Sequence, residues 1–409
     1  WIAGNLKRRD LVALVCVGLV GGLVVVRAFQ IPIVYDESYS IQIAHISRNP
    51  FIANNHPLNT IWLSVAWLLP FGDAEIGYRL LSVASFFLFG VGIIRLLRPV
   101  RSNILWGAAL LSLLFNPLLI EFWGLARGYA LATAAVTWML VAVVNAQPHQ
   151  ESTKISVTSP AAIWGLIAFY SNFSTLFLVV AAWLVVSGAL GGQLHQPRRM
   201  VGNLWSSIGI PVLLLLPGVL WLGALSIAGR LYYSGSDGLV QDTLHSLVMD
   251  STVGLRLNQD WLSSLTLALA LLVALALALG LLPKKPVESL AARETASVVV
   301  MTAALWLVVH YVAGAGFPIS RTATFLIVPV VAVMTFSADQ TLIRRTLATR
   351  RSLLMALRIL GGAFVSMGLI LVSVGTAGSF SRWVNTHETV TWKFDRSADS
   401  VAELVLSNG

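Results

Sequence analysis

Apolar runs long enough to cross a membrane recur along this chain from Leu11 to Gly378, separated by short polar breaks. A helix that spans a bilayer needs about 20 mainly apolar residues. Hydrophobic residues make up 57% of the chain and charged residues only 11%, whereas a soluble domain carries roughly 25% charged residues. A soluble core cannot absorb this much apolar surface. We therefore expect one bilayer-embedded domain over residues 1–378 and a polar tail over residues 379–409, which could be the start of a larger outer domain.

The runs predict an all-α integral membrane fold with about eleven transmembrane helices. We place the spans near residues 11–29, 80–97, 103–120, 128–146, 161–171, 174–190, 204–228, 261–282, 296–313, 322–338 and 353–378. No small-residue cleavage site follows the first run, so we interpret it as a retained span rather than a signal peptide. The fifth run is too short to cross alone, and residues 170–173 could instead be a break within one long tilted helix.

The charge distribution gives the chain a direction across the membrane. The formal net charge is +9, but the basic residues lie in loops between apolar runs rather than on one face, which disfavours a nucleic-acid partner. Cytoplasmic loops are enriched in Lys and Arg. With a cytoplasmic N-terminus, eleven spans place the pairs Arg198–Arg199 and Lys284–Lys285 on the same, cytoplasmic side, whereas one helix across residues 170–173 would separate them. We therefore predict two crossings at this break.

This orientation places the loop 30–79, with its acidic motif, on the outer face. Asp36 and Glu37 follow the first span by about seven residues, and adjacent carboxylates near a membrane are costly unless they pair with a cation or a proton. A carboxylate here can act as a general base toward an acceptor hydroxyl. Alternatively, Asp36 or Ser38 caps the helix that continues through Ile41 to Ile46.

The same outer loop contains His56 directly before Pro57, followed by an apolar stretch with Trp62 and Trp67. That stretch is too short to cross the bilayer, so we expect a helix in the plane of the interface, where Trp is favoured. His56 either hydrogen-bonds a substrate or only precedes the proline that starts this helix.

Three further charged residues are expected on the outer face. Glu121 ends the third span and Arg127 begins the fourth, with Tyr129 two residues later. Glu121 and Arg127 either pair with each other or contribute to one cavity in which Arg127 holds an anionic group. Arg321, at the outer end of a later span, either extends to lipid headgroups or binds a phosphate.

The order of these features resembles the GT-C superfamily of membrane glycosyltransferases, in particular the branch of protein O-mannosyltransferases and the lipid A aminoarabinose transferase. The segments that carry the resemblance are Asp36-Glu37-Ser38-Tyr39, His56-Pro57-Leu58, Phe71-Gly72-Asp73-Ala74-Glu75 with Arg79-Leu80, Asn116-Pro117 to Glu121, and Ala126-Arg127-Gly128-Tyr129, with Arg321 and Pro329 later. The chain departs from the family in having Leu58 where a second proline is common.

The resemblance implies an inverting transfer of a sugar from a polyprenyl-phosphate donor to an acceptor hydroxyl of a lipid, glycan or protein in the cell envelope. It implies Asp36 as the base, with Glu37 and Glu121 as supporting carboxylates. Substrate contacts are expected from Tyr39, His56, Arg127, Tyr129 and Arg321. A divalent cation is left open, with Asp36, Glu37 and Glu121 as its ligands if one binds. The expected location is a bacterial plasma membrane with the active site outside.

Two other functional classes stay open at this stage. A multi-span transporter or lipid flippase would also have many apolar spans with polar breaks such as Ser171-Asn172. A non-catalytic assembly subunit is the third possibility.

Overall fold

The computed structural model describes residues 8–47, 55–69, 75–145, 160–191, 209–230, 235–282, 290–347, 353–386 and 389. Within these ranges the chain is helical, and its only β pairing is an isolated bridge between Gly235 and Phe317. The predicted all-α membrane fold is confirmed. Arg198, Arg199, Lys284, Lys285, the segment 71–74 and most of the predicted tail lie outside the described residues.

The long helices match the predicted spans closely. They are α1 (Arg8–Gln30), α4 (Glu75–Leu96), α7 (Gly128–Asn145), α13 (Gln259–Leu281), α14 (Leu290–Ala313), α15 (Ile327–Leu347), which continues the 3-10 segment η6 (Ser320–Leu326), and α16 (Leu353–Trp383). Helices α5 (Asn103–Leu114) and α6 (Pro117–Trp123) meet at a bend of 51° over the third predicted span. The shorter apolar helices are α8 (Pro160–Ser171), α9 (Leu176–Gly191) and α11 (Ile210–Ile227).

The number of helices that can cross a membrane follows from their length and composition. Among the described residues, seven helices are long and apolar enough to cross a membrane, or eight if the bent pair α5–α6 is one span. The predicted count of about eleven therefore stays a prediction. Side chains such as Leu271 of α13 and Phe364 of α16 are more than half exposed, and a surface this apolar is suited to lipid rather than water.

Helices α8 and α9 form an antiparallel hairpin around the polar break. The indole of Trp183 donates to the carbonyl of Ala161 at 3.1 Å, and a Cβ added to Gly165 would lie 2.9 Å from Val179. Both pairs are centred on Asn172, which precedes the turn η2 (Phe173–Thr175). The chain therefore reverses direction here, as the charge pattern predicts, and α8 and α9 are not one broken helix.

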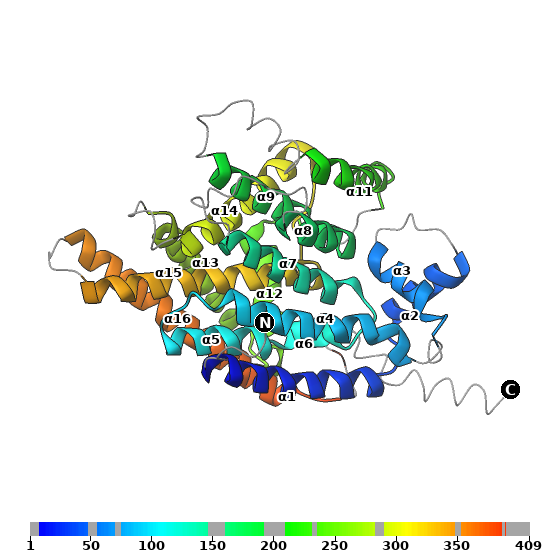
Figure 1. The fold of residues 1–409 in the computed structure, drawn as a ribbon, viewed down its shortest axis with the longest axis horizontal. Helices are drawn as coiled ribbons and strands as arrows, with labels where there is room; N and C mark the ends of the chain where they lie inside the picture. The colour runs from blue at the N-terminus through cyan, green and yellow to red at the C-terminus, as the bar shows by residue number, and fades with distance from the viewer. Residues whose placement is uncertain are drawn as a thin grey trace.

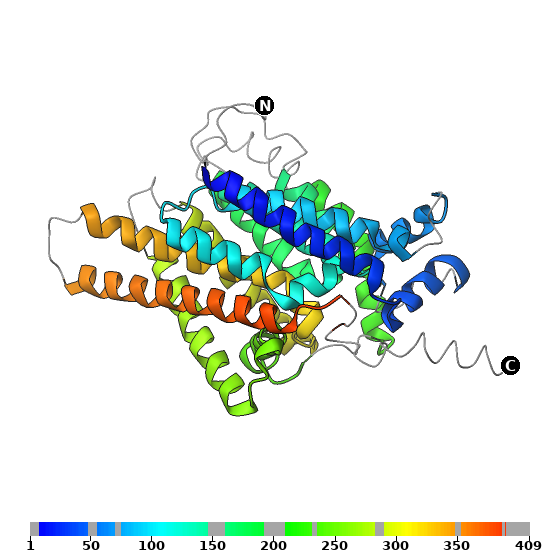
Figure 2. The same cartoon turned by 90° about the horizontal axis from the view of Figure 1, so that it is seen from below.

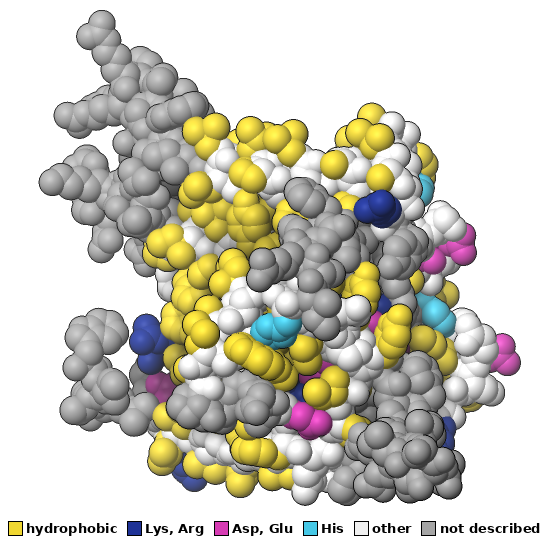
Figure 3. Space-filling model, turned by 90° about the vertical axis from the view of Figure 1, so that its right-hand side faces the viewer, with side chains coloured by type: hydrophobic (Ala, Val, Ile, Leu, Met, Phe, Trp, Pro, Cys, Tyr) yellow, Lys and Arg dark blue, Asp and Glu magenta, His cyan; other side chains and the backbone are white. Residues whose placement is uncertain are grey.

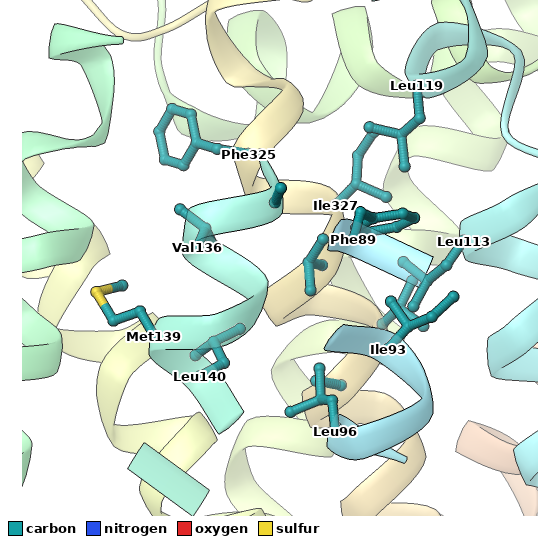
Figure 4. Packing of buried hydrophobic residues seen from close by; sticks show 14 of the residues in the cluster. Phe89, Ile93, Leu96, Leu113, Leu119, Val136, Met139, Leu140, Phe325 and Ile327 are labelled. Atoms are coloured by element: carbon teal, nitrogen blue, oxygen red, sulfur yellow. The ribbon is translucent and has the colours of Figure 1, made fainter. Parts of the chain in front are cut away.

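The centre of the bundle is packed from helices distant in the sequence. Figure 4 shows Phe89, Ile93 and Leu96 of α4 beside Val136 and Leu140 of α7, with residues of α5, α6, η6 and α15 around them. Close approach of α1 and α4 depends on Gly90, where a Cβ would lie 2.5 Å from a methyl group of Val17. Small residues serve this purpose in membrane helices because lipid supplies no hydrophobic drive for helix association.

Polar interactions concentrate at the two ends of the bundle. At one end, which we call the Arg9 end, Arg9 donates to the carbonyls of Val100 and Arg101 at 2.8 and 2.6 Å, and Asp339 accepts from the N–H groups of Arg101 and Ser102 at 3.0 and 2.7 Å. At the opposite end, α2 (Tyr35–Gln42), η1 (Ile43–Ser47) and α3 (Pro57–Ala66) project beyond the long helices (Figure 1; Figure 2).

Helix α3 begins at Pro57 with His56 as its N-cap residue, which confirms the short helix predicted after His56. Its exposed side chains are Ile61, Ser64 and Val65, and the apolar Trp67 and Leu68 are exposed just beyond its end. An apolar exposed face on a helix too short to cross is suited to the membrane interface.

Candidate active site

The acidic pair lies in the first turn of α2. The N-cap residue of this helix is Val34, and its N–H donates to Oε2 of Glu37 at 3.1 Å. The interpretation in which Asp36 or Ser38 caps the helix is wrong, because the helix begins at Tyr35 and both residues are already inside it. Asp36 and Glu37 are both buried, so each charge needs a partner.

Glu37 forms a buried bidentate ion pair with Arg79 of α4. Nε and Nη2 of Arg79 donate to Oε1 and Oε2 at 2.9 and 2.6 Å, and the N–H of Ala126 donates to Oε1 at 2.6 Å. Arg79 also donates to the carbonyls of Ala28 and Pro32, each at 3.0 Å. This pair joins α1, α2, α4 and the turn before α7, and both carboxylate oxygens of Glu37 are engaged.

Asp36 lies between two arginines from distant parts of the chain. Nη1 of Arg321 donates to Oδ2 of Asp36 at 2.5 Å, and Nη2 of Arg127 lies 3.6 Å from the same oxygen. Nη1 of Arg127 donates to the Asp36 carbonyl at 2.9 Å and to the Ser40 hydroxyl at 2.7 Å. Arg321 is 5% exposed, so the interpretation in which it extends to lipid headgroups is wrong.

His56 supports Arg127 from the other side. Its Nδ1 is 2.8 Å from the carbonyl of Ser171, and its Nε2 is 3.2 Å from Nη2 of Arg127. A carbonyl only accepts and a guanidinium only donates, so His56 is a neutral imidazole with its proton on Nδ1. Burial lowers the pKa of His56 well below 6.5, and the charge of Arg127 lowers it further.

Tyr129 packs against both His56 and Arg127. Its ring meets that of His56 edge-on at 4.7 Å between centroids, and the guanidinium of Arg127 lies 5.7 Å from the ring centroid. Viewed onto this end of the molecule, acidic, basic and histidine side chains lie among apolar ones (Figure 3). The cluster of Asp36, His56, Arg127 and Arg321 therefore joins four segments, which are α2, the start of α3, the turn before α7 and η6.

Two other residues were predicted for the site, Glu121 and Tyr39. Glu121 is fully buried in α6, and its charge interacts with the guanidinium of Arg27 near the end of α1. Arg127 forms a salt bridge with Asp36, and the pairing of Glu121 with Arg127 stays a prediction. Tyr39 is partly exposed on α2.

The carboxylates suggested as metal ligands do not fit a metal ion. Both oxygens of Glu37 accept hydrogen bonds from Arg79, and Oδ2 of Asp36 accepts one from Arg321. Within the described ranges, no group of three or more His, Cys, Asp or Glu side chains could hold an ion. Cationic groups next to Asp36 and Glu37 are supplied here by arginines.

The sequence did not identify two components of the site as functional. Arg79 was noted only as part of the resemblance, although an arginine at the start of an apolar span signals a buried partner. The carbonyl of Ser171 orients His56, and a backbone group has no sequence signal beyond the polar break in which it lies.

No protein-family model matches the chain, and no curated protein matches it. Similar solved structures include ArnT from Cupriavidus metallidurans bound to undecaprenyl phosphate, with a TM-score of 0.48 and 13% identity over 92% of this chain and 78% of that one. The apo form gives 0.47 and 12% with the same coverage. The arabinofuranosyltransferase AftD from Mycobacteria gives 0.48 and 15%, over 93% of this chain and 27% of that one.

ArnT and AftD are GT-C glycosyltransferases, the superfamily that the sequence resembles. At 12–15% identity, these similarities concern the fold and not the reaction.

Proposed function

We propose that this chain is an inverting glycosyltransferase that moves a sugar from a polyprenyl-phosphate donor to an acceptor hydroxyl on the outer face of a membrane. The observation that carries the proposal is the pairing of one buried carboxylate, Asp36, with two buried guanidinium groups, Arg321 at 2.5 Å and Arg127 at 3.6 Å. The set combines a base with two cations, which a transfer from a phosphate leaving group requires.

In the proposed reaction, the acceptor oxygen attacks the anomeric carbon of the donor sugar. The bond between that carbon and the phosphate oxygen breaks, and polyprenyl phosphate leaves with the bonding electrons. Arg127 and Arg321 stabilise the negative charge that develops on the leaving phosphate, since guanidinium groups bind phosphate oxygens in a bidentate manner. The acceptor proton passes to the carboxylate of Asp36.

The supporting residues hold these groups in place. Neutral His56 accepts from Nη2 of Arg127 and fixes the direction of its guanidinium. Glu37 and Arg79 fix the first turn of α2, which carries Asp36. We therefore assign Glu37 a structural part rather than a catalytic one.

The pairing of Asp36 with Arg321 suggests an order of binding. Oδ2 of Asp36 now accepts from Arg321, so that lone pair is not available to an acceptor proton. A donor phosphate should bind the two arginines more strongly than the carboxylate of Asp36 does, because it presents several charged oxygens. Donor binding would thus release Asp36, and the donor should bind before the acceptor.

The test uses membranes containing the protein, incubated with a pool of polyprenyl-phosphate sugars while the release of free polyprenyl phosphate is followed. Asp36→Asn should lower the rate by about 10²- to 10⁴-fold, the range for loss of a general base. Asp260→Asn, the same change at an exposed position on α13, is the matched control and should retain the rate.

Full activity in Asp36→Asn would contradict the assignment of the base. Movement of lipid-linked sugar across proteoliposomes, without any product, would instead support the transporter or flippase alternative.

A further inference from the structure

The segment that leads into Arg321 is held by a second part of the chain, residues 235–250. Gly235 and Phe317 exchange two backbone hydrogen bonds of 2.9 Å, and the hydroxyl of Thr243 donates to the carbonyl of Pro318 at 2.7 Å. Arg321 follows Pro318 by three residues, so the start of η6 is fixed from outside its own helix.

Ser320, the residue directly before Arg321, makes two hydrogen bonds to this part of the chain. Its N–H donates to the hydroxyl of Ser246 at 2.7 Å, and its own hydroxyl donates to Oδ2 of Asp250 at 2.6 Å. Ser246 and Asp250 lie one turn apart on α12 (His245–Ser251). Helix α12 thus contacts both the backbone and the side chain of one residue.

The backbone of Ser320 is in the left-handed region, with φ of 49°. Residues with a side chain rarely adopt this conformation, and it persists where the surroundings over-determine it. The two hydrogen bonds that Ser320 donates to α12 provide this constraint. The direction in which Arg321 leaves the backbone depends on the conformation of Ser320.

Asp250 is buried, at 8% exposure, although it lies outside the cluster of Asp36, His56, Arg127 and Arg321. The pKa of its carboxyl group is raised, because burial disfavours the charged form by more than the hydrogen bond from Ser320 favours it. The hydroxyl of Ser320 is the hydrogen-bond donor that offsets the cost of burying this carboxyl.

We infer that Asp250 and Ser320 are positioning residues that aim the guanidinium of Arg321 into the site. This inference rests on the proposed function, in which Arg321 binds the donor phosphate. Without the bond to Asp250, Ser320 can return to an ordinary backbone conformation, and Arg321 turns away from Asp36. Asp250 acts only through Arg321 and does not touch substrate.

A double-mutant cycle tests this, because two residues that act through one group give non-additive effects. Purified protein in nanodiscs is titrated with undecaprenyl phosphate, and the dissociation constant is measured for wild type, Asp250→Ala, Arg321→Gln and the double variant. Each single variant should bind about tenfold more weakly, as expected for loss of a hydrogen bond to a charged group. The double variant should bind no more weakly than Arg321→Gln.

Conservative and control variants separate positioning from loss of fold. Asp250→Asn keeps a side-chain oxygen that can accept from Ser320 and should retain most of the affinity. Ser320→Ala removes the same hydrogen bond from the other side, and serves if Asp250→Ala does not fold. Asp260→Asn should bind like wild type.

The outcomes are distinguishable. If Arg321→Gln binds undecaprenyl phosphate as wild type does, the proposed function fails at the phosphate contact. If Arg321→Gln weakens binding but Asp250→Ala and Ser320→Ala do not, only the positioning inference is overturned. Additive losses in the double variant would also overturn it, since Asp250 would then act on some other group.

Discussion

Asp36 and Glu37 are adjacent and both buried, but their carboxylates meet different partners. Glu37 accepts from Arg79 and from two backbone N–H groups, whereas Asp36 accepts from Arg321 beside Arg127. Consecutive residues of a helix point about 100° apart, so one side chain faces α4 and the other faces η6. Under the proposed function, this difference in partners gives Glu37 a structural part and Asp36 a chemical one.

Replacing Glu37 should therefore affect stability first. Glu37→Gln removes the buried carboxylate from the guanidinium of Arg79, which is 1% exposed, and breaking a buried pair in this way costs about 3–5 kcal/mol. Chemical denaturation in detergent measures the loss. Glu75→Gln is the control, because Glu75 is 3.5 Å from Arg79 but 42% exposed, and its loss should cost about 0.5 kcal/mol. Equal stability of the two variants would refute the structural assignment.

His56 makes the stability of the protein depend on pH. Its pKa in the folded chain is well below 6.5, because burial and Arg127 disfavour the charged ring. As the pH falls below 6.5, the unfolded chain takes up a proton at this residue and the folded chain does not. The contribution of neutral His56 to the free energy of unfolding is therefore fully present above pH 6.5. It is lost below that pH, at up to about 1.4 kcal/mol per pH unit, until the pKa of His56 in the folded chain is reached.

His56→Gln should remove this part of the pH dependence. Unfolding of wild type and variant is compared between pH 7.5 and pH 5, and the difference in their stabilities should shrink as the pH falls. A difference that stays constant over this range would mean that His56 titrates alike in both states.

At the scale of elements, the site depends on how closely α7 meets the turn between α8 and α9. Gly128, the first residue of α7, packs so tightly that an added Cβ would lie 2.0 Å from the carbonyl oxygen of Ser171 and 2.7 Å from Cβ of His56. That carbonyl is the group that orients His56. A single glycine thus sets the separation of three segments of the site.

Gly128→Ala should force α7 and the α8–α9 turn apart. The backbone oxygen of Ser171 cannot yield as a flexible side chain would, so we expect a loss of stability of at least 1–3 kcal/mol, typical of overpacking, together with loss of transfer. Gly107→Ala on α5 is the control, since nothing lies within 4 Å of its added Cβ, and it should be neutral or stabilising. Wild-type activity in Gly128→Ala would contradict this account.

The sequence predicts elements better than it predicts contacts. Helix positions follow from apolar length, because in lipid every backbone group must be satisfied within its own segment. The polar residues near the helix ends then identify Asp36, His56, Arg127 and Arg321 as candidates. The pairing of Glu37 with Arg79, and of Ser320 with Asp250, joins residues 42 and 70 positions apart, and no local pattern specifies such contacts.

For the whole molecule, the arrangement of its two ends decides where the chemistry takes place. Helix α1 has 23 residues, which at about 1.5 Å per residue make it roughly 34 Å long, enough to cross a bilayer core. Arg9 near its start donates to the carbonyl of Val100, just before α5, and Asp36 follows its other end. The Arg9 end, with Arg98 and Arg101 nearby, has the basic residues expected on the cytoplasmic side.

Cysteine labelling tests this orientation directly. In a Cys16→Ala background, cysteines are introduced singly at Ser38 and Asp237, which are exposed at the site end, and at Arg98, which is 53% exposed at the Arg9 end. A membrane-impermeant maleimide added to intact cells should label Ser38→Cys and Asp237→Cys, and Arg98→Cys only after the membrane is opened. The background protein should stay unlabelled. Labelling in the opposite pattern would place the cluster of Asp36, His56, Arg127 and Arg321 on the cytoplasmic face, where the acceptor would have to be a cytoplasmic molecule.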